Sequence, residues 1–198
     1  MVDLKSVGVL ALQGDFEKHL AALKSLGVAT KLIRTSSDFS DVDGLIIPGG
    51  ESTTMTNLLR RSDLENSLRD YVMKNPVMGT CAGLILLSNQ TESTNVIGLG
   101  VIDVDIDRNG YGSQRDSFSA DISLNFDDEN PFHAVFIRAP KITNIGSSVT
   151  ALAELNGEVV MARNSNVLVT SFHPELSENR NIHNYFVKQF VQREEVAA

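Results

Sequence analysis

The first half of the chain alternates short apolar runs with helical patterns. The apolar runs lie at residues 7–12, 29–33, 44–47 and 76–79, and each is predicted to form a buried strand. Apolar residues from Phe16 to Leu26 recur at helical spacing, and Asp15 and Gly27 are expected to cap that helix. Further helices are predicted over residues 52–73, with an interruption near 61–63, and through 84–87. Strands that alternate with helices form right-handed βαβ units, so we predict an α/β fold with a doubly wound, mostly parallel sheet and helices on both faces.

The second half has patterns typical of antiparallel strands. Residues 101–107 alternate polar and apolar side chains, as half-exposed strands do. Strands are also predicted at 118–124 and 134–137, and a hairpin at 159–163 and 167–172. A last helix over 179–193 places Ile182, Phe186 and Phe190 on one face. We therefore expect the parallel sheet to carry an antiparallel extension.

Composition limits the classes of protein that fit the chain. Its 198 residues suit a single domain over 1–198, and 42% of them are hydrophobic. The net charge is −8, and Lys and Arg do not cluster, so no nucleic-acid partner is expected. No apolar run approaches the roughly 20 residues that span a bilayer, and the N-terminus lacks a signal-peptide pattern. A single cysteine excludes an intramolecular disulfide, so we expect a cytoplasmic protein with no membrane partner.

That cysteine lies in a segment with the spacing of a nucleophile elbow, Gly79-Thr80-Cys81-Ala82-Gly83. In this motif a strand turns sharply into a helix, and small flanking residues let the nucleophile project from the turn. The helix N-terminus behind the sulfur stabilises a thiolate, and the Ala82 N–H can donate to an oxyanion. A lone cysteine is more often a core residue, but the place of Cys81 directly after an apolar strand favours a nucleophile.

A cysteine nucleophile needs a base, and His173 is the best candidate among the four histidines. It ends an apolar strand and is followed by Pro174 and Glu175. In an extended segment, residues i and i+2 point the same way, so Glu175 is expected to reach the His173 ring and orient it. His19, on the expected polar side of the first helix, and His183, in the last helix, are expected at the surface, and His133 is expected in a loop.

A third segment, Pro48-Gly49-Gly50-Glu51-Ser52, follows another predicted strand. Its two glycines permit unusual backbone angles and a close approach of backbone N–H groups to a substrate. The Gly50 N–H is therefore a candidate second oxyanion donor, and Ser52 is expected to cap the next helix. The alternative is a plain turn between a strand and a helix.

A calcium loop is faintly suggested by Asp103, Asp105 and Asp107. At the position where such a loop requires glycine the chain has Arg108, and at the position of the final glutamate it has Gln114. No metal site is predicted.

Together these residues resemble the class I glutamine amidotransferases, which use a Cys-His-Glu triad. More narrowly, several segments are similar to the glutaminase subunits of pyridoxal 5′-phosphate synthases. These segments are Leu10-Ala11-Leu12-Gln13-Gly14, residues 44–54, Arg108-Asn109-Gly110-Tyr111-Gly112-Ser113-Gln114, Asp116-Ser117-Phe118, Phe136-Ile137-Arg138-Ala139-Pro140 and residues 171–176. They occur in family order, and they imply a flavodoxin-like α/β fold.

The resemblance implies hydrolysis of L-glutamine to L-glutamate and ammonia, without a cofactor. Cys81 would attack the side-chain amide to give an oxyanion and then a glutamyl thioester, while His173 transfers protons and Glu175 orients it. Gly50 and Ala82 would form the oxyanion hole. The residues implied in binding glutamine are Gly50, Glu51, Ser52, Arg108, Ile137 and Arg138. Glu51 suits the ammonium group of glutamine and an arginine suits its carboxylate, a role that either arginine could fill.

A partner chain is also implied. Ammonia in neutral water is mostly protonated and then is not nucleophilic, so its production is useful only beside an acceptor site. The resemblance identifies the partner as the synthase subunit of pyridoxal 5′-phosphate synthase, in a dodecamer of heterodimers. It also implies that docking completes the oxyanion hole, and a flip of the flexible Gly49–Gly50 peptide would accomplish this.

Three other interpretations compete with this one. A triad glutaminase of histidine or purine synthesis is disfavoured by the Arg108–Gln114 and Phe136–Pro140 segments. A cysteine peptidase or chaperone-like hydrolase of related fold would turn over peptides, and the papain-type Cys-Gly-Ser-Cys-Trp signature is absent from a chain that has no Trp. A non-catalytic scaffold would be favoured by loss of a triad residue, and none is lost.

Overall fold

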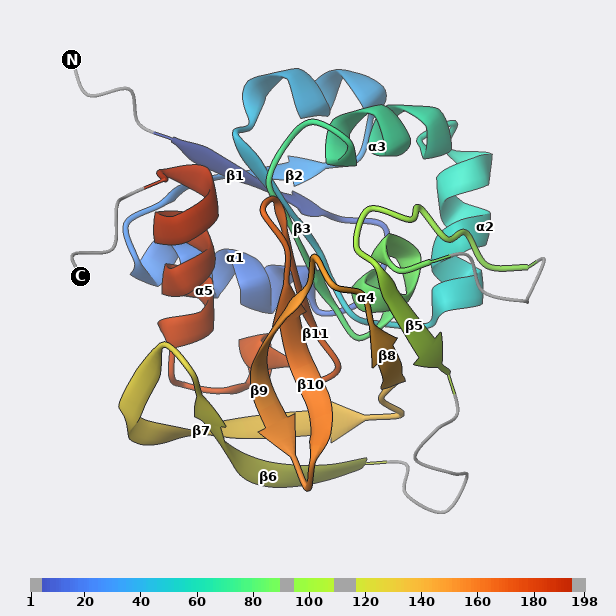
Figure 1. Ribbon diagram of the computed structural model, residues 1–198. Coiled ribbons are helices and arrows are strands. Elements are labelled where there is room, and N and C mark those ends of the chain that lie inside the picture. Colours follow the sequence, from blue (N-terminus) through green and yellow to red (C-terminus); the bar gives the residue numbers. More distant parts are fainter. Residues whose placement is uncertain (1–4, 90–94, 109–116, 194–198) are drawn as a thin grey trace.

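The computed structural model describes residues 5–89, 95–108 and 117–193, and at its centre lies a seven-stranded sheet (Figure 1). From one edge to the other, the strands are β2 (Ala29–Ile33), β1 (Ser6–Leu10), β3 (Gly44–Ile47), β4 (Val77–Thr80), β11 (Val167–Thr170), β10 (Glu158–Arg163) and β9 (Thr150–Leu155). The first five are parallel, and the last two add to them in antiparallel fashion. The carboxyl ends of the parallel strands therefore meet at one edge, where open α/β sheets hold their ligands.

Helices cover both faces of the sheet, as the sequence predicts. One face carries α1 (Phe16–Ser25) and α5 (Asn181–Phe186), which continues as a π-helical turn over Val187–Val191; the other carries α2 (Ser52–Arg61), α3 (Glu65–Val72), α4 (Ala82–Leu87) and a 3₁₀ helix, η1 (Ser36–Asp41). Alternate side chains of β3 enter two separate hydrophobic clusters. Ile46 packs into the cluster beneath α1 and α5, whereas Leu45 and Ile47 pack beneath α2, α3 and α4. This two-sided burial is what a doubly wound sheet requires.

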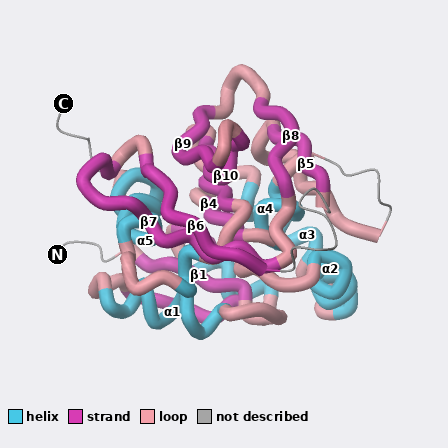
Figure 2. The backbone as a smooth tube through the Cα atoms, turned by 90° about the horizontal axis from the view of Figure 1, so that it is seen from below, coloured by secondary structure: helices cyan, strands magenta, loops and turns pink. Residues whose placement is uncertain are grey.

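Two short antiparallel ribbons complete the predicted extension. They pair β5 (Val104–Asp107) with β8 (Lys141–Ile145), and β6 (Ser117–Leu124) with β7 (Asp127–Ile137). Figure 2 shows them as separate ribbons. Val104 and Ile142 of the first ribbon join the cluster beneath α2, whereas Phe132 and Phe136 of the second join the cluster beneath α1. The β6–β7 ribbon thereby brings the end of β7 toward the carboxyl edge of the main sheet, where His173 N–H donates to the carbonyl of Val135.

The sequence prediction missed β8, β9 and η1. The β9 segment Thr150-Ala151-Leu152-Ala153-Glu154-Leu155 is rich in residues that favour helices, and its pairing with β10 overrides that preference. Boundaries also differ, since β5 begins at Val104 and α5 at Asn181. Asp15 precedes α1 as predicted but makes no side-chain capping hydrogen bond, whereas Gly27 has the positive φ of 73° typical after a helix. Within the described ranges, no helix is both long and apolar enough to cross a membrane.

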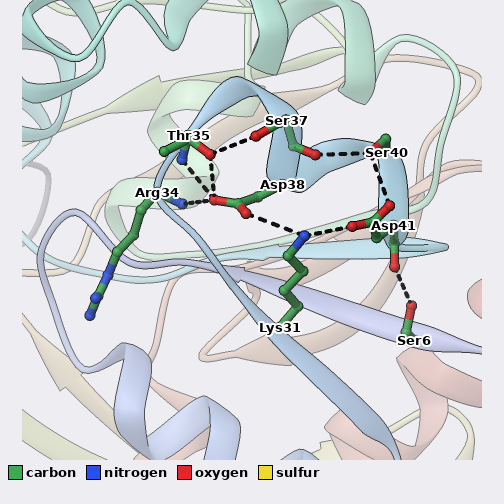
Figure 3. A network of polar contacts seen from close by, with 8 residues as sticks. All are labelled: Ser6, Lys31, Arg34, Thr35, Ser37, Asp38, Ser40 and Asp41. Carbon is green, nitrogen blue, oxygen red and sulfur yellow. Dashed lines mark hydrogen bonds and ion pairs between the residues drawn. The ribbon is translucent and has the colours of Figure 1, made fainter.

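A polar network fixes η1 beside β2 (Figure 3). Thr35 and Asp38 form a capping box, in which the Asp38 carboxylate accepts from the backbone N–H of Thr35 at 2.8 Å. Lys31 of β2 lies 3.2 Å from Asp38 and 2.8 Å from Asp41. The Thr-Ser-Ser-Asp spacing of this box was the sequence signal for η1.

The start of α4 depends on unusually close backbone packing. A Cβ built on Gly83 would lie 2.2 Å from the carbonyl oxygen of Ile47, and one built on Gly79 would lie 2.6 Å from the carbonyl carbon of Gly83. These neighbours are backbone atoms in a sheet and a helix, so they cannot rotate aside. Glycine at both positions therefore lets α4 begin directly at the tip of β4.

We expect Gly83→Ala to lower the free energy of unfolding by about 2–3 kcal/mol, because an added methyl group overpacks a rigid contact. The loss should occur although alanine is better than glycine in a helix by about 1 kcal/mol. Urea denaturation of both proteins measures it. Gly157→Ala is the matched control, since its Cβ meets open space and only its φ of 79° is unfavourable, at about 1 kcal/mol. Equal losses in the two variants would contradict the proposed close contact.

Candidate active site

Cys81 lies between β4 and α4 in a strained backbone conformation, with φ 49° and ψ −101°. A positive φ is rare outside glycine, and such strain costs about 1–3 kcal/mol. The Cys81 N–H donates to the carbonyl of Thr170 at 2.9 Å, which anchors the turn to β11. The predicted sharp turn from strand to helix is therefore present, and it places the buried sulfur at the carboxyl edge of the sheet.

His173 lies at the same edge because it follows β11, the parallel neighbour of β4. Its ring packs on Gly49, where an added Cβ would be 2.3 Å from ring atom Cε1. The interaction with Cys81 raises the pKa of the ring, and ring atom Nδ1 lies 2.8 Å from Oε1 of Glu175. The structure thus brings together the three residues predicted to be catalytic.

The route by which Glu175 reaches His173 differs from the prediction. The segment is not extended, because Pro174–Leu176 forms a 3₁₀ helix, η2. Pro174 occupies its first position, where the fixed φ of proline suits a helical turn. The predicted contact is right, but a turn rather than strand alternation produces it.

Charge complementarity governs this cluster. Burial alone would lower the pKa of His173, but the hydrogen bonds with Cys81 and Glu175 and the Glu175 charge raise it to about 10. Burial would raise the pKa of Glu175, whereas the nearby His19 and the hydrogen bond from His173 hold it at about 2. The imidazole is therefore a strong acceptor for a thiol proton, and the carboxylate stays ionised to stabilise the resulting charge.

The prediction that His19 and His183 lie at the surface is wrong. Both are fully buried, and His19 Nδ1 lies 2.9 Å from His183 Nε2. His19 Nε2 in turn lies 3.3 Å from Oε2 of Glu175. The predicted loop position of His133 is also wrong, because it lies in strand β7, where its exposed ring contacts Asp121 at 2.8 Å.

The sequence contained a signal for both buried histidines. His19 lies three residues after Phe16 and four before Leu23, on the apolar face of α1. His183 lies three residues before Phe186 and follows the buried Ile182. Helical periodicity alone therefore places both rings toward the core.

The loops after β1 and β3 meet beside His173. Gly50 has a φ of 144°, and a Cβ there would lie 2.9 Å from Nε2 of Gln13. Gln13 Nε2 donates to the carbonyl of Glu51 at 2.6 Å. The contact between Gly14 and Gly49 is tighter than that between Gly50 and Gln13, since a Cβ added to Gly14 would lie 1.9 Å from the Gly49 carbonyl oxygen. The Gly49–Gly50 peptide is therefore enclosed between the His173 ring and the loop after β1.

Glu51, and not Ser52 as predicted, caps α2. Its carboxylate accepts from the backbone N–H groups of Thr53 at 3.0 Å and Thr54 at 2.6 Å, while Ser52 is buried in the first turn. Burial opposes ionisation, but these hydrogen bonds and the Thr54 hydroxyl lower the pKa of Glu51 to about 2. Arg108 approaches the same carboxylate at 3.8 Å. A fixed negative charge thus lies beside the glycine turn.

Ile137 and Arg138 lie at the end of β7, on another side of the thiol. The Cys81 Sγ lies 3.8 Å from the Ile137 carbonyl oxygen, its hydrogen-bond acceptor. Arg138 is exposed and has a positive φ of 45°. Arg108 therefore approaches the Glu51 carboxylate, and Arg138 directly follows Ile137 in the chain, while the rest of the predicted 108–114 segment, from residue 109 on, lies outside the described residues.

No group of three or more His, Cys, Asp or Glu side chains in the described part of the chain is arranged to hold a metal ion. Asp103 and Asp105, which belong to the faint calcium pattern, instead accept from Asn89 at 2.9 and 3.0 Å. These carboxylates support a loop between β4 and β5.

Comparisons with known proteins identify the family of the chain. A model described as the SNO glutamine amidotransferase family matches residues 9–192. A pyridoxal 5′-phosphate synthase subunit PdxT from Francisella philomiragia is 47% identical over 182 residues, which cover 92% of this chain and 97% of that protein. A protein of the same name from Carboxydothermus hydrogenoformans is 45% identical over 184 residues, or 92% of this chain and 96% of that protein. A crystal structure of a glutamine amidotransferase superposes with a TM-score of 0.84 at 41% identity, covering 91% of this chain and 96% of that one.

These matches confirm the resemblance seen in the sequence, and the structural match confirms the predicted fold class. They extend through the strands, helices and loops that build the elbow and the glycine turn. The chain belongs to the SNO glutamine amidotransferase family.

Proposed function

We propose that the chain, as one catalytic domain, hydrolyses the side-chain amide of L-glutamine to L-glutamate and ammonia. The observation that carries this proposal is the buried arrangement of Cys81, His173 and Glu175 on a strained elbow. Cys81 attacks the amide carbon, and the tetrahedral oxyanion collapses to a glutamyl thioester as ammonia leaves. Water then hydrolyses the thioester. The side chains supply every group that these steps need, without a cofactor.

His173 transfers the protons of this reaction. Its Nδ1–H donates to Glu175, so Nε2 is the atom that accepts the proton of the Cys81 thiol. The raised pKa of His173 favours this transfer. The ring then protonates the departing ammonia and, in the second half of the reaction, accepts a proton from the attacking water.

Two backbone N–H groups form the oxyanion hole in this proposal. The Ala82 N–H belongs to the first turn of α4, where free N–H groups favour negative charge. The Gly50 N–H is the second donor. Because Gly14 packs against the Gly49 carbonyl, a partner that moves the loop after β1 would also reorient the Gly49–Gly50 peptide. This contact supports an oxyanion hole that docking completes.

The two charged ends of glutamine find complementary groups in the proposed site. Glu51 binds the ammonium group through Oε1, which accepts from the Thr53 N–H and keeps a lone pair, whereas Oε2 accepts from both the N–H and the hydroxyl of Thr54. Arg108 and Arg138 are the candidates for the carboxylate. The remaining proposed contacts come from Gly50, Ser52 and Ile137.

The proposed partner is a synthase subunit that receives the ammonia for pyridoxal 5′-phosphate formation. The support comes from relatives named as subunits of that synthase, each matched over at least 96% of its length. We propose a cytoplasmic hetero-oligomer, a dodecamer of heterodimers. Delivery within a complex keeps ammonia unprotonated until it reacts.

We expect Cys81→Ala to reduce glutamate release from L-glutamine by about 10⁴-fold or more, because the nucleophile is lost. His173→Gln should have a comparable effect. The assay measures glutamate with and without an added pyridoxal 5′-phosphate synthase subunit. His133→Gln is the matched histidine control and should retain activity, since the His133 ring is exposed and pairs with Asp121. Unchanged turnover in Cys81→Ala would contradict the proposed function.

We also expect Gly49→Ala to reduce glutamate release by about 100-fold while the protein stays folded. The added methyl group would lie 2.3 Å from Cε1 of His173 and so displace the ring, and a misplacement of about 1 Å has this kinetic cost. Kinetics and thermal unfolding are measured on the same samples. Gly157→Ala, in the β9–β10 turn, should keep full activity. Wild-type kinetics in Gly49→Ala would show that the ring does not depend on this contact.

A further inference from the structure

Two histidines that the proposed reaction does not use lie behind its catalytic carboxylate. His19 comes from α1 and His183 from α5, two helices that lie against each other on one face of the sheet (Figure 1). Both rings are fully buried, with centroids 5.2 Å apart. The contacts run in series from His183 to His19 at 2.9 Å, from His19 to Glu175 at 3.3 Å, and from Glu175 to His173 at 2.8 Å.

We propose that His19 and His183 form a neutral relay that positions Glu175 and keeps it ionised for His173, in which His183 hydrogen-bonds with His19 and Nε2 of His19 faces Oε2 of Glu175. This proposal rests on the proposed function, because it assigns Glu175 the task of orienting the catalytic base. His19 and His183 are positioning residues, since neither touches the nucleophile or the substrate.

The protons on the relay follow from its acceptors. Glu175 Oε1 accepts from His173 Nδ1, whereas Oε2 is buried and has no aligned hydrogen bond within the described chain. The nitrogen that faces Oε2 is Nε2 of His19. A carboxylate oxygen needs a donor there, so Nε2 of His19 carries the proton and its Nδ1 is an acceptor. His183 must then donate from Nε2.

The unpartnered atom at the far end agrees with this direction. Nδ1 of His183 is buried without a hydrogen-bond partner among the described residues. In the proposed relay this atom holds a lone pair and lacks a proton. The reverse direction would leave a buried N–H there without an acceptor and would aim the lone pair of His19 at the Glu175 carboxylate. Only the first direction avoids both penalties.

Neutrality matters because a second cation would compete with His173 for the charge of Glu175. The groups that face His19 are Glu175, His173, His183, Thr80 and Asp15, and Arg180 lies near His183. Burial, the largest effect, lowers the pKa of His19 although Glu175 and Asp15 oppose it. Burial and the neighbouring His19 lower the pKa of His183 to about 3. The relay therefore donates to the carboxylate without supplying a positive charge near neutral pH.

The direct test is NMR spectroscopy of the full chain labelled with ¹⁵N-histidine, recorded between about pH 6 and pH 8. We expect both His19 and His183 to be neutral Nε2–H tautomers throughout this range. A charged ring, or an Nδ1–H tautomer on either residue, would overturn the proposal. This result does not depend on glutamine turnover, so it stands apart from the fate of the proposed function.

The kinetic test compares His19→Leu with His19→Gln, whose amide keeps a donor toward Glu175. In the presence of the synthase subunit, we expect His19→Leu to lower kcat about 10- to 100-fold with little change in KM. The acid limb of the kcat–pH profile of His19→Leu should move to higher pH by about one unit. The reason is that the ionised form of Glu175 loses a donor, which raises the pKa of Glu175. His19→Gln should restore most of kcat and the wild-type acid limb.

Equal kinetics and an unchanged acid limb of the kcat–pH profile in the two His19 variants would overturn the proposal. They would show that the two histidines only pack in the core. If His19→Leu does not fold, His183→Leu replaces it, since it removes the donor that sets the His19 tautomer and leaves His19 in place. Its acid limb should shift in the same direction by a smaller amount, and the absence of any shift would again contradict the relay. His133→Leu serves as the surface control.

Discussion

The close approach of α4 to the tips of β3 and β4 is the constraint on which the rest of the site depends. Only glycine fits at positions 79 and 83, because the Ile47 carbonyl and the helix backbone occupy the space of a side chain. This packing forces Cys81 into its strained conformation and directs the sulfur beyond the sheet. The cost of about 1–3 kcal/mol is a small part of what two hydrophobic clusters on opposite faces of the sheet contribute.

A second constraint is that the carboxylate of Glu175 stays ionised although it is buried. Glu175 lies in the interior, where an ionised group without partners would take up a proton. Its two oxygens instead face two histidine rings, one of which belongs to the proposed reaction. A single carboxylate therefore connects the chemistry at the sheet edge with the packing of α1 against α5.

The sequence predicted best what depends on local pattern. The strand after each helix could be read from apolar runs, and the elbow could be read from the spacing of Gly79, Cys81 and Gly83. It failed where a distant partner decides the outcome. The β9 strand exists because β10 pairs with it. The cap of α2 is a local error, because the longer side chain of Glu51, rather than Ser52, accepts from two nearby N–H groups. For His19 the helical phase is misread, because its spacing from Phe16 and Leu23 places it on the apolar face of α1, and for His183 the phase is not used.

The separation of the two buried histidines has a consequence for biosynthesis. They lie 164 residues apart in the sequence, and His173 follows Cys81 by almost half of the chain. The turn at Cys81 is held by the Thr170 carbonyl of β11, and the base follows that strand. The proposed site is therefore incomplete on a nascent polypeptide until β11 and His173 have been synthesised.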